Sequence, residues 1–136
     1  IYPVWLAHSV TKIQYCVQIY PARVGQIAAT WALTGLDQWR ADKRPKLAAK
    51  AHAFATTMKA CVGWDIQSLG AYFAYIRHPF SATPAKDVAR RLACENGLLL
   101  IPGSYFGENQ EQYLRLSFGN LTEDTLATLP DRFRLK

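Results

Sequence analysis

Residues 97–118 read Gly-Leu-Leu-Leu-Ile-Pro-Gly-Ser-Tyr-Phe-Gly-Glu-Asn-Gln-Glu-Gln-Tyr-Leu-Arg-Leu-Ser-Phe, and the fold class follows from this stretch. The continuous apolar run 98–101 predicts a buried strand, and residues 113–118 predict a second one. Between the strands, Gly103 and Gly107 bracket a short aromatic loop. Such a loop lets the backbone approach a ligand and offers aromatic side chains to cover it. Taken alone, the same residues fit an ordinary turn equally well.

Arg115 is the most unusual residue of this stretch. The alternation of a strand puts it on the opposite face from its neighbours Leu114 and Leu116. An arginine in mid-strand either faces solvent, forms a structural ion pair, or is aimed at an anion. Its planar guanidinium can bind a carboxylate through two parallel hydrogen bonds, which a lysine cannot match. For an arginine considered alone, the solvent-facing or ion-pair interpretation is the more common one.

On the N-terminal side of this stretch, the pattern predicts a helix over residues 84–96. Ser81 or Thr83 is the expected cap at its start, and Gly97 is the expected terminator. Further upstream, two aromatic and branched segments predict strands, at residues 64–66 and 71–77.

On the C-terminal side, a final helix is expected after Thr122, whose hydroxyl can cap it. Its predicted apolar side consists of Leu126, Leu129 and Phe133.

The N-terminal part of the chain is predicted to be helical. Helices are expected over residues 5–15 and 22–33, and a long helical pattern runs from Asp37 toward Cys61. Pro45 interrupts that pattern, either as a kink or as the first residue of a second helix. A core-facing stripe recurs at three- and four-residue steps, namely Leu47, Ala51, Phe54, Ala55 and Met58. The order of all these elements implies an α+β sheet covered by helices.

Composition limits the class of protein. Half of the 136 residues are apolar, which suits one compact domain, and no apolar run approaches the roughly 20 residues that span a bilayer. The N-terminus lacks the pattern of a signal peptide, so we expect a cytoplasmic protein. The odd, widely spaced Cys16, Cys61 and Cys94 are expected to be free thiols.

The net charge of +6 raises the hypothesis of nucleic-acid binding. The basic residues instead lie along predicted helices, as expected of solvated faces, and no nucleic-acid-binding motif accompanies them. A positive cleft would also suit small anionic substrates. His8, His52 and His78 are too far apart in the sequence to predict a metal site.

Segments 71–73, 90–93, 97–107 and 113–118 and the tail 129–135 occur in a specific order. This ordered set resembles the C-terminal small domain of fold-type I (class I/II) pyridoxal-phosphate-dependent aminotransferases, the aspartate aminotransferase superfamily. That family has an aromatic strand, a helix, a strand ending in Pro-Gly-x-x-Phe-Gly, and a strand with a substrate-binding arginine. The resemblance implies a small, mostly antiparallel sheet covered by helices and preceded by a long helix.

The resemblance also implies a division of the chain and roles for its residues. Residues 1–35 would be a remnant of the large domain and interdomain helices, and residues 36–136 the small domain. Arg115 would bind the α-carboxylate of the amino acid or 2-oxo acid substrate. The loop with Gly103, Ser104 and Phe106 would lie beside it and help to close the site.

According to the same resemblance, pyridoxal phosphate would be held by a large N-terminal domain in a full-length homodimer. The family's Schiff-base lysine follows a serine by three residues and precedes an Arg-x-Gly element. Ser9 and Lys12, followed by residues 23–25, imitate this pattern, but the spacer is too long and contains no glycine. Lys12 is therefore expected to be a surface lysine, and the chain alone is expected to be inactive.

No residue of this chain is predicted to be catalytic, to bind the cofactor or to bind a metal. Because the chain starts at Ile1 and not at a methionine, we expect that something upstream was removed or not included. The alternative is a free-standing, non-catalytic α+β module that binds a small carboxylate or a protein partner through the same arginine and loop.

Overall fold

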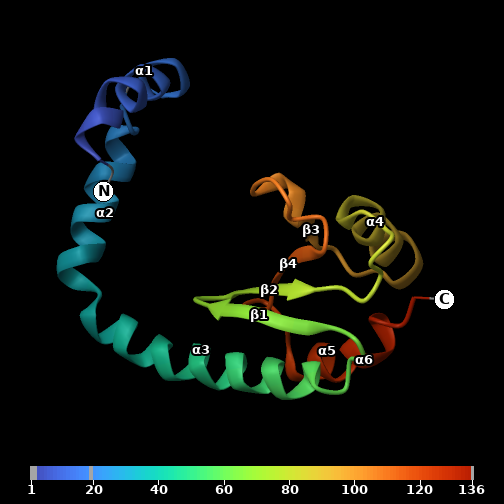
Figure 1. Ribbon diagram of the computed structural model, residues 1–136. Coiled ribbons are helices and arrows are strands. Elements are labelled where there is room, and N and C mark those ends of the chain that lie inside the picture. The colour runs from blue at the N-terminus through green and yellow to red at the C-terminus, as the bar shows by residue number, and fades with distance from the viewer. Residues whose placement is uncertain (1–2, 19, 136) are drawn as a thin grey trace. The chain divides into compact units, whose positions relative to one another are not determined.

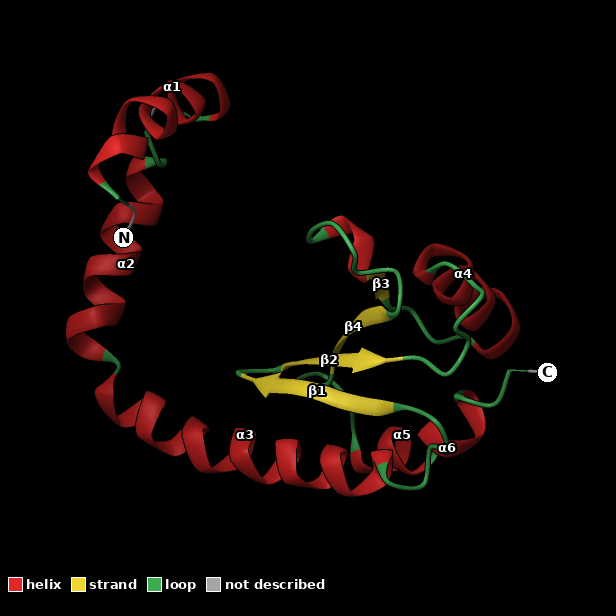
Figure 2. Ribbon diagram, in the orientation of Figure 1, coloured by secondary structure: helices red, strands yellow, loops and turns green. Residues whose placement is uncertain are grey.

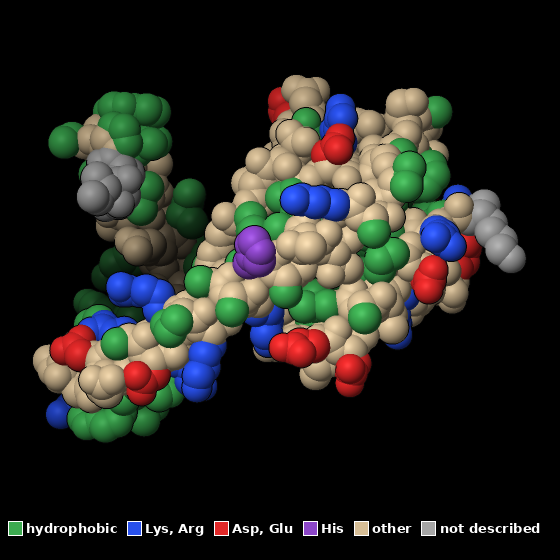
Figure 3. Space-filling model, turned by 90° about the horizontal axis from the view of Figure 1, so that it is seen from below, with side chains coloured by type: hydrophobic (Ala, Val, Ile, Leu, Met, Phe, Trp, Pro, Cys, Tyr) green, Lys and Arg blue, Asp and Glu red, His purple; other side chains and the backbone are tan. Residues whose placement is uncertain are grey.

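The computed structural model describes residues 3–18 and 20–135 (Figure 1). The chain divides into two compact units, residues 1–41 and residues 42–136. Among the described residues, no helix is both long enough and apolar enough to span a membrane. On the face shown in Figure 3, basic side chains are dispersed among acidic and apolar ones.

The first unit is helical. It contains the 3-10 helix η1 (Val4–Leu6), helices α1 (Ala7–Val17) and α2 (Arg23–Gly35), and the start of α3 (Asp37–Met58). The helices predicted over residues 5–15 and 22–33 are therefore confirmed. No described side chain within residues 3–41 is buried, although many of them are large and apolar. This unit thus has no core of its own among its described residues.

Helix α3 continues through Pro45, so the alternative of a separate helix starting at that proline is wrong. Proline has no N–H to donate to the carbonyl four residues back, that of Ala41. Pro45 and Ala41 are both exposed, so water can reach the carbonyl left without this donor. The boundary between the two units falls at this carbonyl.

The second unit is built on a four-stranded antiparallel sheet (Figure 2). Its order is β1-β2-β4-β3, and the strands are β1 (Asp65–Gly70), β2 (Phe73–Arg77), β4 (Tyr113–Ser117) and β3 (Ile101–Pro102). The predicted α+β fold, with a small antiparallel sheet preceded by a long helix, is confirmed. The strand predicted at 71–77 starts at Phe73, because Ala71 (φ 47°) lies in the turn from β1.

The strand predicted at 98–101 is much shorter than expected. Only Ile101 and Pro102 pair with β4. The N–H of Leu98 donates instead to the carbonyl of Leu92 and thereby closes the end of the preceding helix. Leu98 and Leu100 are buried and Leu99 is 84% exposed, so the run alternates like a strand although no described strand pairs with it before Ile101.

Helix α4 (Ala85–Asn96) ends as predicted, with Gly97 in the left-handed conformation (φ 62°). Its start differs from the prediction, since neither Ser81 nor Thr83 caps it. Pro84 is the N-cap residue, and the Ala85 N–H donates to Oε2 of Glu111 at 3.1 Å. A carboxylate at this end also interacts favourably with the helix dipole. This cap comes from a residue 26 positions away, which local sequence cannot reveal.

The core lies against one face of the sheet. Ala74 and Ile76 of β2 and Leu114 and Leu116 of β4 are all buried there. Helices α3, α5 (Glu123–Ala127) and α6 (Leu129–Arg132) lie on one side of the sheet in Figure 1.

Several predicted helix residues take part in this core. Within the α3 stripe, Phe54 and Met58 are buried, and Leu47, Ala51 and Ala55 are half-buried. The predicted last helix is divided into α5 and α6 at Thr128. Thr122 caps α5 as expected, and the core-facing residues of this segment are the predicted Leu126, Leu129 and Phe133.

His78 is the one buried polar residue of the described core, with 1% of its surface exposed. Its Nε2 lies 2.8 Å from the carbonyl oxygen of Glu111, and among the described atoms its Nδ1 has no partner. Burial lowers the pKa of His78 below its ordinary value of 6.5, and the carbonyl and charge of Glu111 only partly oppose this effect. The folded chain therefore favours a neutral His78.

We predict that the second unit loses stability as the pH falls below 6.5. The unfolded chain binds a proton at His78 more readily than the folded chain does, so unfolding is favoured in this range. The loss should begin near pH 6.5 and continue until the depressed folded pKa is passed, with a slope of at most about 1.4 kcal/mol per pH unit. Denaturant unfolding between pH 7.5 and 5 measures it. His78→Gln should reduce the change of the unfolding free energy with pH, whereas the control His52→Gln, at an exposed histidine, should not. An equal slope of unfolding free energy against pH in the wild type and both variants would contradict the prediction.

Candidate functional site

Arg115 lies in the middle of β4, on the face of the sheet opposite the core. It pairs with Tyr75 of β2 on one side and with Ile101 of β3 on the other. Its chain neighbours Leu114 and Leu116 are buried, whereas Arg115 itself is half-buried. The predicted alternation is therefore confirmed.

Aromatic rings, and not acidic groups, surround the guanidinium of Arg115. Within residues 3–18 and 20–135, no carboxylate forms an ion pair with it. Its central carbon instead lies 4.5 Å from the ring centroid of Phe73 and 4.5 Å from that of Phe106. Of the interpretations that the sequence left open, the structural ion pair is thus not found in the described part of the chain. The cation remains able to bind an external anion.

A hollow of about 380 Å³ opens beside this guanidinium. Strand β1 contributes Ser68 and Gly70, β2 contributes Phe73, Ala74 and Tyr75, and the remaining lining residues are Phe106 and Arg115. Arg115 is the only charged residue among the described residues of this lining. The hollow therefore combines aromatic walls with a single positive charge, which suits a small molecule carrying one carboxylate.

Tyr75 forms part of the wall and ties it to the neighbouring loop. Its ring stacks on that of Tyr113, with centroids 5.3 Å apart, and its hydroxyl donates to Oε1 of Gln110 at 2.8 Å. Burial and, to a lesser extent, the charge of Tyr113 raise the pKa of Tyr75 above its ordinary value. Tyr75 thus stays protonated at neutral pH and keeps its hydrogen bond to the loop.

Gly103 allows the aromatic loop to approach the sheet. It is buried at the start of the 3-10 helix η2 (Gly103–Tyr105), and its carbonyl accepts the N–H of Phe106 at 2.8 Å. A Cβ at this position would lie 2.5 Å from the carbonyl oxygen of Gln110 and 2.6 Å from the hydroxyl of Tyr75. Any side chain here would push the loop, and with it Phe106, away from Arg115.

Of the four predicted site residues, Arg115 and Phe106 are brought together at the hollow. Gly103 lies beneath the loop, and Ser104 is half-buried and outside the lining. Sequence reasoning missed Phe73, although it belongs to the predicted aromatic strand. Only the register of β2 against β4 puts Phe73 next to Arg115.

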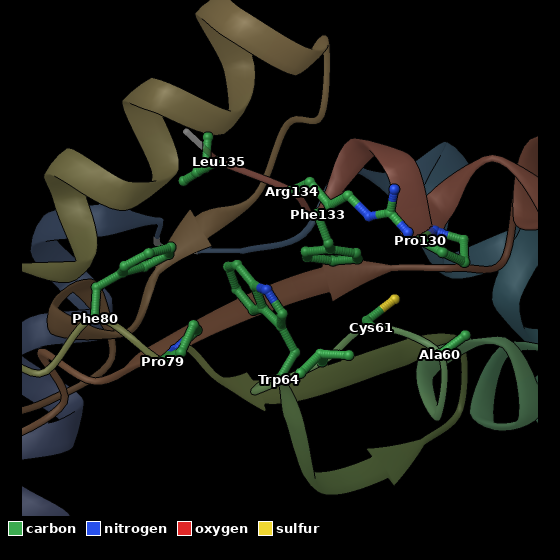
Figure 4. A pocket seen from close by; sticks show the side chains of 10 residues that line it. Ala60, Cys61, Trp64, Pro79, Phe80, Pro130, Phe133, Arg134 and Leu135 are labelled. Carbon is green, nitrogen blue, oxygen red and sulfur yellow. The ribbon is translucent and has the colours of Figure 1, made fainter.

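A second hollow, of about 280 Å³, lies between the end of α3 and the C-terminal segment (Figure 4). Trp64, Phe80 and Phe133 face it, and burial raises the pKa of the Cys61 thiol beside them to about 11. A thiol with this pKa is a poor nucleophile at neutral pH. The one charged residue of the described lining, Arg134, is already paired with Asp131 at 3.4 Å. Among the described residues there is also no cluster of metal ligands. The hollow at Arg115 is therefore the candidate site that the proposal below concerns.

The sequence also matches a known protein family. Residues 8–133 match the family model described as aminotransferase class I and II. The chain belongs to this family. Among curated proteins, none matches the sequence.

Solved aminotransferase structures share the fold. The α-aminoadipate aminotransferase LysN of Thermus thermophilus is 22% identical in sequence, with a TM-score of 0.70. The match covers 97% of this chain and 35% of the LysN chain. The N-succinyldiaminopimelate aminotransferase of Mycobacterium tuberculosis is 25% identical (TM-score 0.67), and the match covers 88% of this chain and 32% of that aminotransferase. An aspartate aminotransferase of Rhodobacter sphaeroides is 18% identical (TM-score 0.71), and the match covers 90% of this chain and 31% of that enzyme. This aminotransferase-family chain thus spans about a third of the length of the structures it matches.

We predict that Gly103→Ala destabilises the second unit by about 2 kcal/mol, because the new methyl group would collide with two backbone carbonyls and a tyrosine hydroxyl. Gly107→Ala in the same loop is the matched control, since its Cβ would meet nothing closer than 4.0 Å. It should change the free energy of unfolding by at most about 0.5 kcal/mol. Urea unfolding of both variants measures the difference, and equal values for the two would contradict the tight packing at Gly103.

Proposed function

We propose that this chain is the C-terminal part of a pyridoxal-phosphate-dependent aminotransferase, which moves an amino group between an amino acid and a 2-oxo acid. In this proposal, Arg115 binds the α-carboxylate of both substrates. The observation that carries it is a guanidinium without an ion-pair partner among the described residues, placed at the only charged position in the described lining of an aromatic hollow. Membership of the aminotransferase class I and II family supplies the reaction class.

The proposal also assigns the two segments of the chain to different domains. Residues 36–136 would form the small domain, and residues 1–35 would be a remnant of the large domain and of the helices that join the two. In support, the core residues of the second unit all come from α3 and the segments after it, whereas no described residue of 3–41 is buried. Exposed apolar helices of this kind are expected where another part of a larger protein packs.

In this proposal the described residues of the chain do not hold pyridoxal phosphate by themselves. No described lysine lines the hollow, and Lys12, which imitates the family's lysine motif, is an exposed residue of α1. When bound to the protein, this cofactor acts as the electron sink of the reaction. We therefore assign the cofactor to a large domain, and we expect the chain alone to be inactive.

The remaining loop residues would help to close the site at Arg115. Gly103 keeps the loop close to the sheet, Phe106 covers Arg115, and Ser104 lies between them in the loop. Movement of a small domain with such a loop would exclude water and fix the carboxylate. A full-length cytoplasmic homodimer completes the proposal.

In the full-length enzyme, Arg115→Ala should raise the KM for the amino acid and lower kcat/KM by about 30- to 1000-fold. This range corresponds to the loss of about 2–4 kcal/mol for a bidentate, charge-assisted contact. Arg115→Lys should recover only part of the loss, since a lysine cannot make two parallel hydrogen bonds. Arg90→Ala removes an exposed arginine of α4 and serves as the control. Steady-state kinetics decide, and unchanged kcat/KM in Arg115→Ala would contradict the proposed role.

We also predict that the isolated chain self-associates through its exposed apolar helices. Val24, Ile27 and Trp31 of α2 are all more than half exposed. Replacing these three residues with lysine should shift the chain toward monomer in light scattering at high concentration. The control places the same three charges at polar positions of the same helix, Gln26, Thr30 and Thr34. A wild-type chain that stays monomeric, or two triple variants that behave alike, would contradict the prediction.

A further inference from the structure

We propose that Phe73 and Phe106 are positioning residues that hold the Arg115 guanidinium in the orientation that receives a carboxylate. The proposal rests on the function proposed above, because it concerns the residue assigned to the α-carboxylate. It adds two side chains that do not touch the carboxylate themselves and act through Arg115.

The two rings reach the guanidinium from different elements. Phe73 stands on β2, where it pairs with Ser117, so it is the diagonal neighbour of Arg115 across the strand pair. Phe106 comes from the loop after η2 and is fixed there by its N–H bond to the Gly103 carbonyl. Each ring centroid lies 4.5 Å from the guanidinium carbon, well within the roughly 6 Å over which a cation is attracted to a ring face.

In this proposal the two rings contact the faces of the guanidinium, which leaves the hydrogen-bond donors of the arginine available. The N–H groups of a guanidinium point outward in its plane, whereas rings that lie over it occupy its faces. A carboxylate can therefore approach along the edge while both rings stay in place. An acidic neighbour would instead occupy the donors, and the described residues provide none.

The rings also reduce the entropy that binding would cost. An arginine side chain has several rotatable bonds, and fixing them only when the substrate arrives would weaken binding. In the described structure no ion pair fixes the guanidinium, so the aromatic contacts are the interactions that orient it. Loss of one ring should weaken carboxylate binding by roughly tenfold without removing the charge.

The test uses the full-length protein that contains this chain, with ¹⁵N-labelled arginine, and pyruvate as the smallest 2-oxo acid probe. Nuclear magnetic resonance follows the Nε–Hε signal of Arg115, which ring currents should shift upfield. Phe106→Leu should reduce this upfield shift and raise the pyruvate Kd about tenfold. Phe106→Tyr should restore both values, because it restores a ring face. Phe106 is 48% exposed, so its replacement should leave the core intact, and thermal unfolding checks this.

Tyr105→Leu is the matched control. This residue is the neighbouring aromatic of the same loop and is exposed, and it makes no described ring contact with Arg115. It should bind pyruvate as the wild type does. Phe73→Leu provides an independent second variant from the strand side and should behave like Phe106→Leu.

The outcomes separate the positioning role from the carboxylate clamp. If Phe106→Leu and Phe73→Leu bind pyruvate as the wild type does, whereas Arg115→Ala does not bind, the positioning role is wrong and the clamp stands. If the wild type and Arg115→Ala bind pyruvate with the same Kd, or if neither binds it, the carboxylate-binding role of Arg115 is contradicted. In that case an Arg115 Nε–Hε signal that is unchanged in Phe106→Leu would also overturn the positioning role.

Discussion

The pairing of β2 with β4 is the constraint on which the rest of the second unit depends. It sets Tyr75 opposite Arg115 and Ala74 opposite Leu116. Because side chains alternate, this one register puts the aliphatic residues on the core face and Arg115 with its aromatic neighbours on the other face. A slip by one residue would direct a guanidinium into the core and two leucines to the hollow. The cost of burying that unpaired charge makes the register as strict a requirement for folding as it is for the site.

The polar segment of residues 110–112 then fixes the surroundings of the hollow. Gln110 accepts from Tyr75, Glu111 caps α4 and binds His78, and the Gln112 carbonyl accepts the His78 N–H. One short loop thereby joins a strand, a helix and a buried histidine. These contacts explain how a polar stretch between two strands keeps the aromatic loop close to Arg115. Gly103 is required in that loop because a Cβ there would lie 2.5 Å from the carbonyl oxygen of Gln110.

Local sequence predicts what depends on local rules. The termination of α4 at Gly97, the cap at Thr122 and the outward position of Arg115 all follow from residue type and spacing, and all are confirmed. The predictions that the structure did not confirm concern residues whose partners are far away in the sequence. The start of α4 depends on Glu111, and the strand at 98–101 is shortened because Leu98 closes the helix before it. Phe73 could not be recognised at the site, since its neighbour Arg115 is 42 residues away and comes close only through the sheet register.

Whether Arg115 receives the substrate carboxylate can be seen in a crystal structure of the full-length protein with a bound amino acid or 2-oxo acid. We expect two guanidinium N–H groups within about 2.7–2.9 Å of the α-carboxylate oxygens, with Phe73 and Phe106 still in contact with the guanidinium. A substrate whose α-carboxylate is bound by other residues, with Arg115 facing solvent, would contradict this expectation.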